Sequence, residues 1–199
     1  DCCKANDRVF FCTCGVGFDA AVSQKFAEEK RRGSLTYIKN TVAEYLSYKP
    51  EPYELLVDNQ TIKEKAFLVA CANASQYGNN AFIAPHANIQ DGRMDLTILS
   101  PFTPLDIAPL AIQLFTKQID RNSKIKTMKA QQVTIIRQNP GVMHLDGEPV
   151  MADSRIDISI MPQSLHVVTP EVVSFTEEVH NLFGEVTRFF DKKLPYIFR

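Results

Sequence analysis

The sequence HLDGEP, residues 144–149, lies near the end of a long run of strand-like sequence and carries Asp146 and Glu148 on either side of a glycine. An Asp-Gly pair between apolar strands is typical of a tight hairpin turn. Two carboxylates this close also couple their titrations, which can leave one of them ready to accept a proton. His144 alternates with Asp146 along the strand and could share its face, and a lone histidine in such a place is more often structural than catalytic. The stretch predicts a turn, a pair of reactive acids, or both.

Most of the chain around this stretch has the alternation or the β-branched and aromatic content of strands. The pattern predicts about eight to ten strands. The predicted strands are 8–14, 53–57, 61–65, 66–74, 94–99, 124–129, 132–137, 142–145, 156–160 and 165–168. Asp58-Asn59-Gln60 is expected to form a hairpin turn. Cys12 and Cys14 alternate along the first strand, so both are expected to face the core.

Helical spacing is confined to a few segments. Asp19 is expected to cap a helix that ends at Gly33 and is followed by a second helix from Ser34. Thr103-Pro104 predicts the start of a helix over 105–115. The last segment, 174–193, has a strong apolar face and predicts an amphipathic helix. That helix would dock on this domain, on another domain, on a second copy as a homodimer, or on a membrane surface. The fold class is therefore α+β, mostly β: a β-sandwich with peripheral helices and a C-terminal amphipathic helix.

Composition excludes some classes of function. The net charge of -1 gives no electrostatic basis for binding nucleic acid. The longest apolar run, 66–72, is far shorter than the roughly 20 residues that span a bilayer. Five cysteines at spacings that match no zinc pattern favour a reducing cytoplasm.

Two other polar stretches are candidate sites. Asp91 and Asp95 flank an Asp-Gly turn, which predicts either a simple turn or an oxygen-rich site for magnesium or calcium. The polar loop 73–80 directly follows a strand buried on both faces. A solvated loop is the default interpretation, and the alternative is a functional loop, since loops on rigid scaffolds often carry function.

Five motifs in order give the chain a family resemblance: FFCTCGVGFDAAV, NASQYGN, IAPHANIQDGRMDL, LDGEP and SLHVVTP, within residues 10–170. Together they resemble the C-terminal domain of the diacylglycerol kinase and sphingosine kinase superfamily, in its bacterial lipid kinase branch. The resemblance implies a β-sandwich domain over residues 1–170, a helical extension over 171–199, and an N-terminal nucleotide-binding domain that is absent from this chain. The chain alone is therefore expected to have little or no kinase activity.

The resemblance also implies the chemistry and its residues. Members transfer phosphate from Mg-ATP to a lipid hydroxyl, so the expected cofactors are Mg²⁺ and ATP and the partner is a lipid. The catalytic acids fall on Asp146 and Glu148. The magnesium site falls on Asp91 with the carbonyls of Asn88 and Arg93, and the cofactor-binding residues are Asn73, Tyr77 and Gly78. A non-catalytic lipid- or partner-binding β-sandwich and an NAD kinase-like C-terminal domain remain alternatives.

Overall fold

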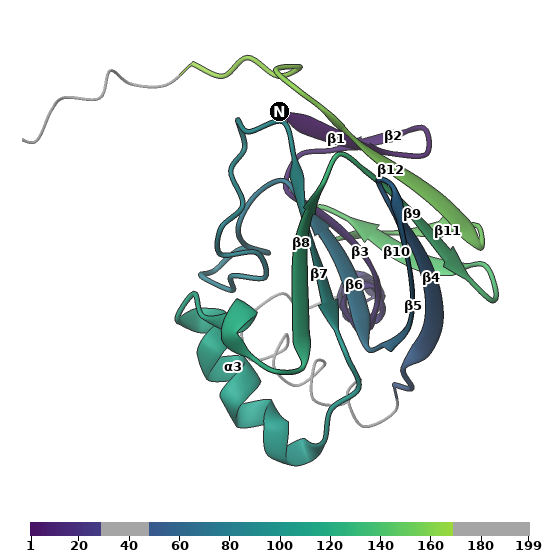
Figure 1. Ribbon diagram of the computed structural model, residues 1–199, viewed down its shortest axis with the longest axis vertical. Helices are drawn as coiled ribbons and strands as arrows, with labels where there is room; N and C mark the ends of the chain where they lie inside the picture. The colour runs from purple at the N-terminus through teal and green to yellow at the C-terminus, as the bar shows by residue number, and fades with distance from the viewer. Residues whose placement is uncertain (29–47, 169–199) are drawn as a thin grey trace, which may run out of the picture. The chain divides into compact units, whose positions relative to one another are not determined.

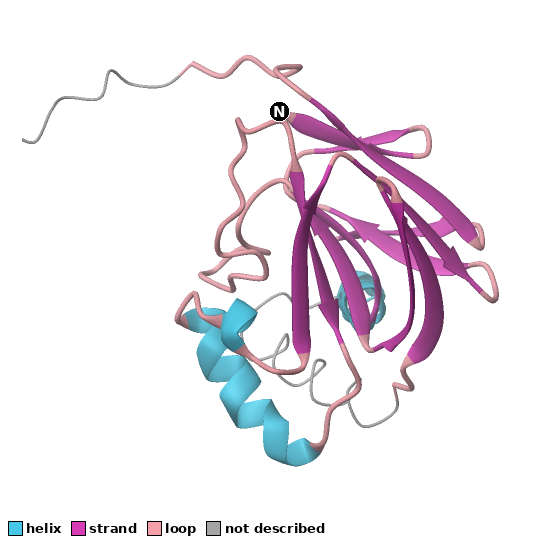
Figure 2. Ribbon diagram, in the orientation of Figure 1, coloured by secondary structure: helices cyan, strands magenta, loops and turns pink. Residues whose placement is uncertain are grey.

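The computed structural model describes residues 1–28 and 48–168, and within them two six-stranded antiparallel sheets face one another (Figures 1 and 2). The first sheet contains, in spatial order, β2 (Arg8–Phe10), β1 (Cys2–Ala5), β12 (Arg155–Met161), β9 (Gln132–Arg137), β4 (Glu51–Val57) and β5 (Gln60–Ala66). The second contains β11 (Glu148–Ala152), β10 (Gly141–Leu145), β3 (Thr13–Gly17), β6 (Leu68–Ala72), β7 (Met94–Leu99) and β8 (Ile125–Ala130). The predicted β-sandwich is confirmed.

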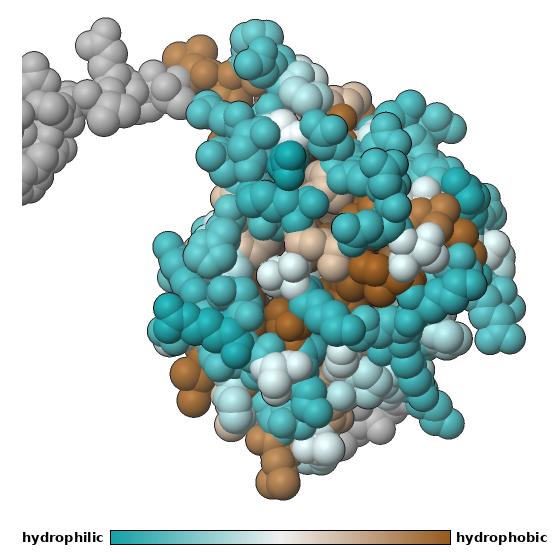
Figure 3. Space-filling view, in the orientation of Figure 1, coloured by the Kyte–Doolittle hydropathy of each residue, from teal (hydrophilic) through white to brown (hydrophobic). Residues whose placement is uncertain are grey.

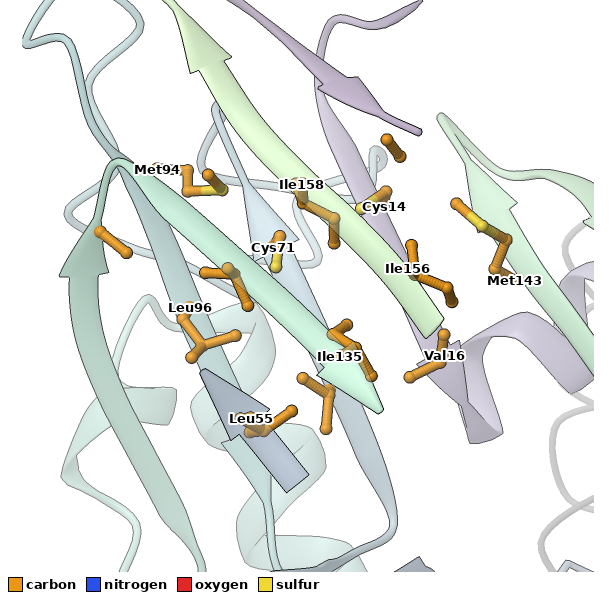
Figure 4. Packing of buried hydrophobic residues seen from close by; sticks show 14 of the residues in the cluster. Cys14, Val16, Leu55, Cys71, Met94, Leu96, Ile135, Met143, Ile156 and Ile158 are labelled. Atoms are coloured by element: carbon orange, nitrogen blue, oxygen red, sulfur yellow. The ribbon is translucent and has the colours of Figure 1, made fainter. Parts of the chain in front are cut away.

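The main core fills the space between the sheets (Figure 4). Side chains alternate across each strand, so every second residue of the inner faces enters this core. It includes Cys14, Val16, Cys71, Leu96 and Ile135, all at most 1% exposed.

A second core lies on the outer face of the second sheet, where helices and a loop cover it. The described helical elements are α1 (Phe18–Glu28), η1 (Pro104–Asp106), α3 (Ile107–Phe115) and η2 (Ile119–Arg121). Leu110 of α3 and Ile119 of η2 pack into this core, and α1 contacts β3, β10 and β11. Because both of its faces are covered, β6 is buried along its whole length.

The outer surface of α3 stays apolar and exposed. Ile112 and Phe115 of α3 are 63% and 57% exposed, and Leu105 of η1, just before the helix, is 88% exposed. Apolar side chains protrude in this region of the space-filling view (Figure 3). Among the described residues, no helix has the length and apolar character needed to cross a membrane.

Several local predictions are confirmed. Asp58 has φ +48 between β4 and β5, as expected for a two-residue hairpin. The helical segment after residue 103 begins with Pro104, and Thr103 and Asp106 form a capping box. The last predicted helix and the segment 29–47 lie outside the described residues.

Other predictions are wrong. The predicted strand 8–14 is two strands, β2 and β3, which belong to different sheets, and the chain crosses between them at Phe11 and Cys12. Cys12 is therefore exposed in the crossover, whereas Cys14 is buried. Asp19 lies inside the first turn of α1 rather than at its cap. The segment 165–168 is not a strand and its Val168 is 98% exposed.

Candidate active site

The motifs selected from the sequence meet at one end of the second sheet. Leu145, at the end of β10, pairs with Cys14 near the start of β3. Thr13 pairs with Ala72 at the end of β6, and Ala72 pairs with Asp95 near the start of β7. Because neighbouring strands are antiparallel, the turn after β10, the crossover before β3, the loop after β6 and the turn before β7 all lie at this end. We call it the site end of the second sheet.

Asp146 is fixed in place by the crossover between the two sheets. Its Oδ1 accepts hydrogen bonds from the backbone N–H groups of Cys12 (2.7 Å) and Thr13 (2.9 Å), and its Oδ2 accepts one from Phe11 (2.8 Å). Its own N–H donates to the Thr13 carbonyl at 2.8 Å. A carboxylate has about four acceptor positions, so Oδ2 retains one toward solvent.

Glu148 begins β11 on the other side of Gly147 and is exposed. Its carboxylate has no hydrogen-bond or ion-pair partner within residues 1–28 and 48–168. Asp146 and Gly147 both have positive φ, +50 and +86, as a type I′ hairpin turn requires. The stretch is therefore a turn, as predicted, and it presents one anchored and one exposed carboxylate.

Asp91 and Asp95 share the ammonium group of Lys129. Lys129 Nζ lies 2.7 Å from Asp91 Oδ2 and 3.1 Å from Asp95 Oδ2. Burial would raise the pKa of Asp91, but the hydrogen bonds from Lys129 and the Arg93 amide outweigh it, so the pKa of Asp91 is lowered. Burial dominates at Asp95 and raises its pKa despite the same ammonium.

The predicted magnesium ligands lie together in one turn. Asp91 Oδ1 accepts the Arg93 N–H at 3.0 Å, and the Asn88 carbonyl accepts the Asp91 N–H at 3.4 Å. Carboxylate and carbonyl oxygens are the donors that magnesium and calcium prefer, so the donor set has suitable chemistry. Among the described residues, no group of three or more acidic, histidine or cysteine side chains could hold a metal. The cation paired with Asp91 in this structure is Lys129, and the charge of Arg93 also lowers the pKa of Asp91.

The three residues predicted to bind a cofactor hold different places in the loop after β6. Asn73 is 2% exposed, and its Nδ2 donates to the carbonyls of Asp1 and Phe11 at 3.1 and 2.8 Å. Tyr77 donates its hydroxyl to Asp19 Oδ2 at 2.8 Å. Gly78 has φ +121 and open space where a Cβ would be. Asn73 and Tyr77 therefore engage the protein itself in this structure.

A buried polar cluster lies next to the turn, and only part of it was expected. His144 is 1% exposed, so it does not lie on the exposed side with the Asp146 carboxylate. Its Nε2 lies 3.1 Å from Asp19 Oδ2. The one sequence feature that could have pointed to this contact is Gly15, which pairs with His144 across the two strands.

Comparison with known proteins identifies relatives of the whole described domain. Residues 12–169 match the family model described as the YegS C-terminal NAD kinase beta sandwich-like domain. A probable lipid kinase YegS-like protein of Shewanella frigidimarina is 26% identical over 172 residues, covering 85% of this chain and 55% of that protein. A diacylglycerol kinase of Mycobacterium tuberculosis is 26% identical over 171 residues, covering 82% of this chain and 53% of that protein.

The fold is also found among solved structures. A putative diacylglycerol kinase from Bacillus anthracis superposes with a TM-score of 0.62 at 19% identity, covering 86% of this chain and 56% of that one. The chain spans about half the length of the curated relatives it matches.

Proposed function

The chain belongs to the family of YegS C-terminal NAD kinase beta sandwich-like domains, and from this membership we propose that it is the C-terminal domain of an ATP-dependent lipid kinase. The acceptor is the hydroxyl of a diacylglycerol- or sphingosine-like lipid. The observation that carries the proposal is that the Asp-Gly-Glu turn and the Asp91 turn lie at the same end of the second sheet. Phosphoryl transfer needs a proton acceptor and a centre of positive charge, and the Asp91 turn would supply the second by holding magnesium beside Lys129.

The reaction is an attack by the lipid hydroxyl on the γ-phosphorus of ATP. A new O–P bond forms, the bond from phosphorus to the β,γ-bridging oxygen breaks, and ADP leaves with that oxygen. The hydroxyl proton passes to the Asp146 and Glu148 pair, whose positions on a tight turn suit general base catalysis. Positioning supplies most of the rate, which agrees with three backbone amides fixing the Asp146 carboxylate.

Asp91, with the carbonyls of Asn88 and Arg93, would hold magnesium. The ion would offset phosphate charge when bound. Lys129 keeps the Asp91 and Asp95 carboxylates in place and contributes a positive charge of its own. The nucleotide is bound mainly by a preceding domain, with the loop carrying Asn73, Tyr77 and Gly78 forming one wall of the ATP site. The lipid substrate brings the enzyme into peripheral contact with the membrane from the cytoplasm, where the five cysteines stay free thiols.

The test compares the full-length protein with the 199-residue chain. Each is incubated with γ-labelled ATP, Mg²⁺ and detergent-solubilised diacylglycerol or sphingosine, and labelled lipid is separated by chromatography. We expect transfer to a lipid by the full-length protein and none by the chain alone. In a parallel reaction with NAD as the acceptor, formation of labelled NADP would support the NAD kinase alternative. Loss of all transfer with lipid binding retained would support the non-catalytic alternative.

A further inference from the structure

We propose that His144 is a positioning residue for the Asp146-Gly147-Glu148 turn: it accepts the Gly147 amide through Nδ1, and Asp19 and Tyr77 fix its tautomer. This inference rests on the proposed kinase function and adds to it a residue that touches neither substrate nor cofactor. It connects three separate motifs, since Tyr77 lies in the loop after β6, Asp19 in the first turn of α1 and His144 in β10.

His144 occupies a closed place on the outer face of the second sheet. Its neighbours along β10, Met143 and Leu145, point into the core between the sheets, so His144 points the opposite way. Helix α1 packs over this part of β10, and the Tyr77 ring meets the imidazole edge-on, with centroids 5.8 Å apart. With a side chain only 2% exposed, His144 can contact a substrate only through the protein groups around it.

The space for this cluster exists because residue 15 is glycine. A Cβ at Gly15 would overlap Asp19 Oδ2 and lie 2.8 Å from His144 Nε2. Any side chain at this position would push the carboxylate and the imidazole apart. Glycine at position 15, directly opposite His144, is therefore needed for the contact between His144 and Asp19.

The hydrogen bonds determine which imidazole nitrogen carries the proton. The Gly147 N–H points at His144 Nδ1 at 3.4 Å, and a backbone N–H can only donate. Nδ1 must accept and is unprotonated, so the proton of the neutral ring lies on Nε2 and is donated to Asp19 Oδ2 at 3.1 Å. The Tyr77 hydroxyl donates to the same oxygen at 2.8 Å.

This chain of bonds gives the turn a second support, in addition to the crossover amides that bind Asp146. Asp146 holds φ +50, a conformation that costs a non-glycine residue free energy and persists only when its surroundings fix it. The crossover amides hold the Asp146 side chain, and His144 holds the next backbone amide. Losing the second support would let the acids move, and a displacement of about 1 Å can reduce a rate on the order of 100-fold.

Two substitutions of His144 distinguish a role in positioning the turn from a role in packing alone. At position 144, asparagine places an acceptor near the position of the histidine Nδ1 and loses the contact with Asp19. Glutamine places a donor near the position of Nε2 and loses the contact with Gly147. In the full-length kinase we expect H144Q to lower kcat on the order of tenfold with KM values for ATP and lipid nearly unchanged. We expect H144N to retain kcat within about threefold. Equal losses in the two variants, or losses that follow their melting temperatures, would overturn the proposal.

The tautomer provides a second readout that needs no kinase assay. Long-range ¹⁵N–¹H correlation spectra of the 199-residue chain should show His144 protonated at Nε2 and bare at Nδ1. A ring protonated at Nδ1 overturns this inference even if the kinase is active. An inactive wild-type full-length protein overturns the proposed function, whatever tautomer the chain shows.

Discussion

Lys129 and Asp91 form an ion pair of 2.7 Å that joins β8 to the turn before β7, and the same ammonium lies 3.1 Å from Asp95. One cation thus balances two carboxylates at the site end of the second sheet. Its side chain is 35% exposed, so solvent weakens but does not remove the interaction.

K129M should destabilise the chain by about 1 kcal/mol at neutral pH, because two carboxylates lose their partner. The pKa of Asp91 is lowered in the folded state, so its contribution is present above its unfolded pKa of about 3.9 and is lost as the pH falls. The pKa of Lys129 is raised, so its contribution persists until strongly alkaline pH. Urea unfolding across the pH range measures the acidic and the alkaline pH at which the contribution of the ion pair is lost. K63M is the control, since Lys63 and Glu54 form a more exposed pair and should contribute little. A similar loss in both variants would contradict the prediction.

The same substitution should increase the response to magnesium. The ammonium of Lys129 and a divalent cation would compete for Asp91, so the K129M chain should gain more thermal stability from added Mg²⁺ than the wild type does. Melting curves with and without the ion measure this. The double variant D91N/K129M should lose the gain; if it keeps the gain, the ion binds elsewhere.

D146N and E148Q should differ in their effect on stability, so that their effects on folding can be distinguished from their effects on turnover. Asparagine cannot accept all three backbone amides, so D146N should destabilise the chain by about 1–2 kcal/mol. The Glu148 carboxylate makes no such bonds within the described residues, so E148Q should change stability by less than about 0.5 kcal/mol. Urea midpoints of the isolated chain give both values. In the full-length kinase, near-normal turnover of either variant removes that acid from the reaction.

G15A should destabilise the chain by about 1–3 kcal/mol, because a methyl group has no room beside Asp19 and His144. The matched control is G141A, whose added Cβ would lie 3.4 Å from the nearest atom, Nη1 of Arg137. Its backbone has no positive φ, so the control should be close to neutral. Thermal and urea unfolding compare the two. Equal effects would mean that the space at Gly15 is not specifically required.

R137M should be among the more damaging substitutions, at about 3 kcal/mol. Arg137 is 7% exposed, and its guanidinium donates to the backbone carbonyls of Gly141, Val142, Ala152 and Asp153. Methionine keeps the apolar stem and removes the guanidinium donor from those carbonyls. R155M is the control, since Arg155 pairs with Asp157 on the surface, with both side chains 56% exposed. A melting temperature for R137M equal to that of the control would contradict this role.

The sandwich was predictable where a strand has a complete local pattern. The run at β6 is apolar at every position and is buried on both faces, and the Asp58 turn joins two alternating strands. The strands β1 and β11 were not predictable, since each is short and carries no clear alternation. The segment 165–168 has strand-like residues, but it pairs with no strand in the described part of the chain, and propensity alone does not make a strand.

The site was predictable in its residue types and not in its contacts. The acids of the turn follow from a short motif, but the amides that bind Asp146 lie more than 130 positions away along the chain. The role of Asp19 was interpreted as a helix cap because capping is a local signal. Its contact with His144 depends on how α1 folds back over the sheet, which no local pattern records.

The two-residue crossover at Phe11 and Cys12 has its length set by two separate demands. It must carry the chain from one sheet to the other, and its amides must meet the Asp146 carboxylate. One inserted residue would turn every side chain of β3 to the opposite face or move the amides off the acid. The length of this crossover is therefore fixed by the fold, whereas its side chains are free to vary. A change in its length would disrupt both the packing of the two sheets and the binding of the Asp146 carboxylate.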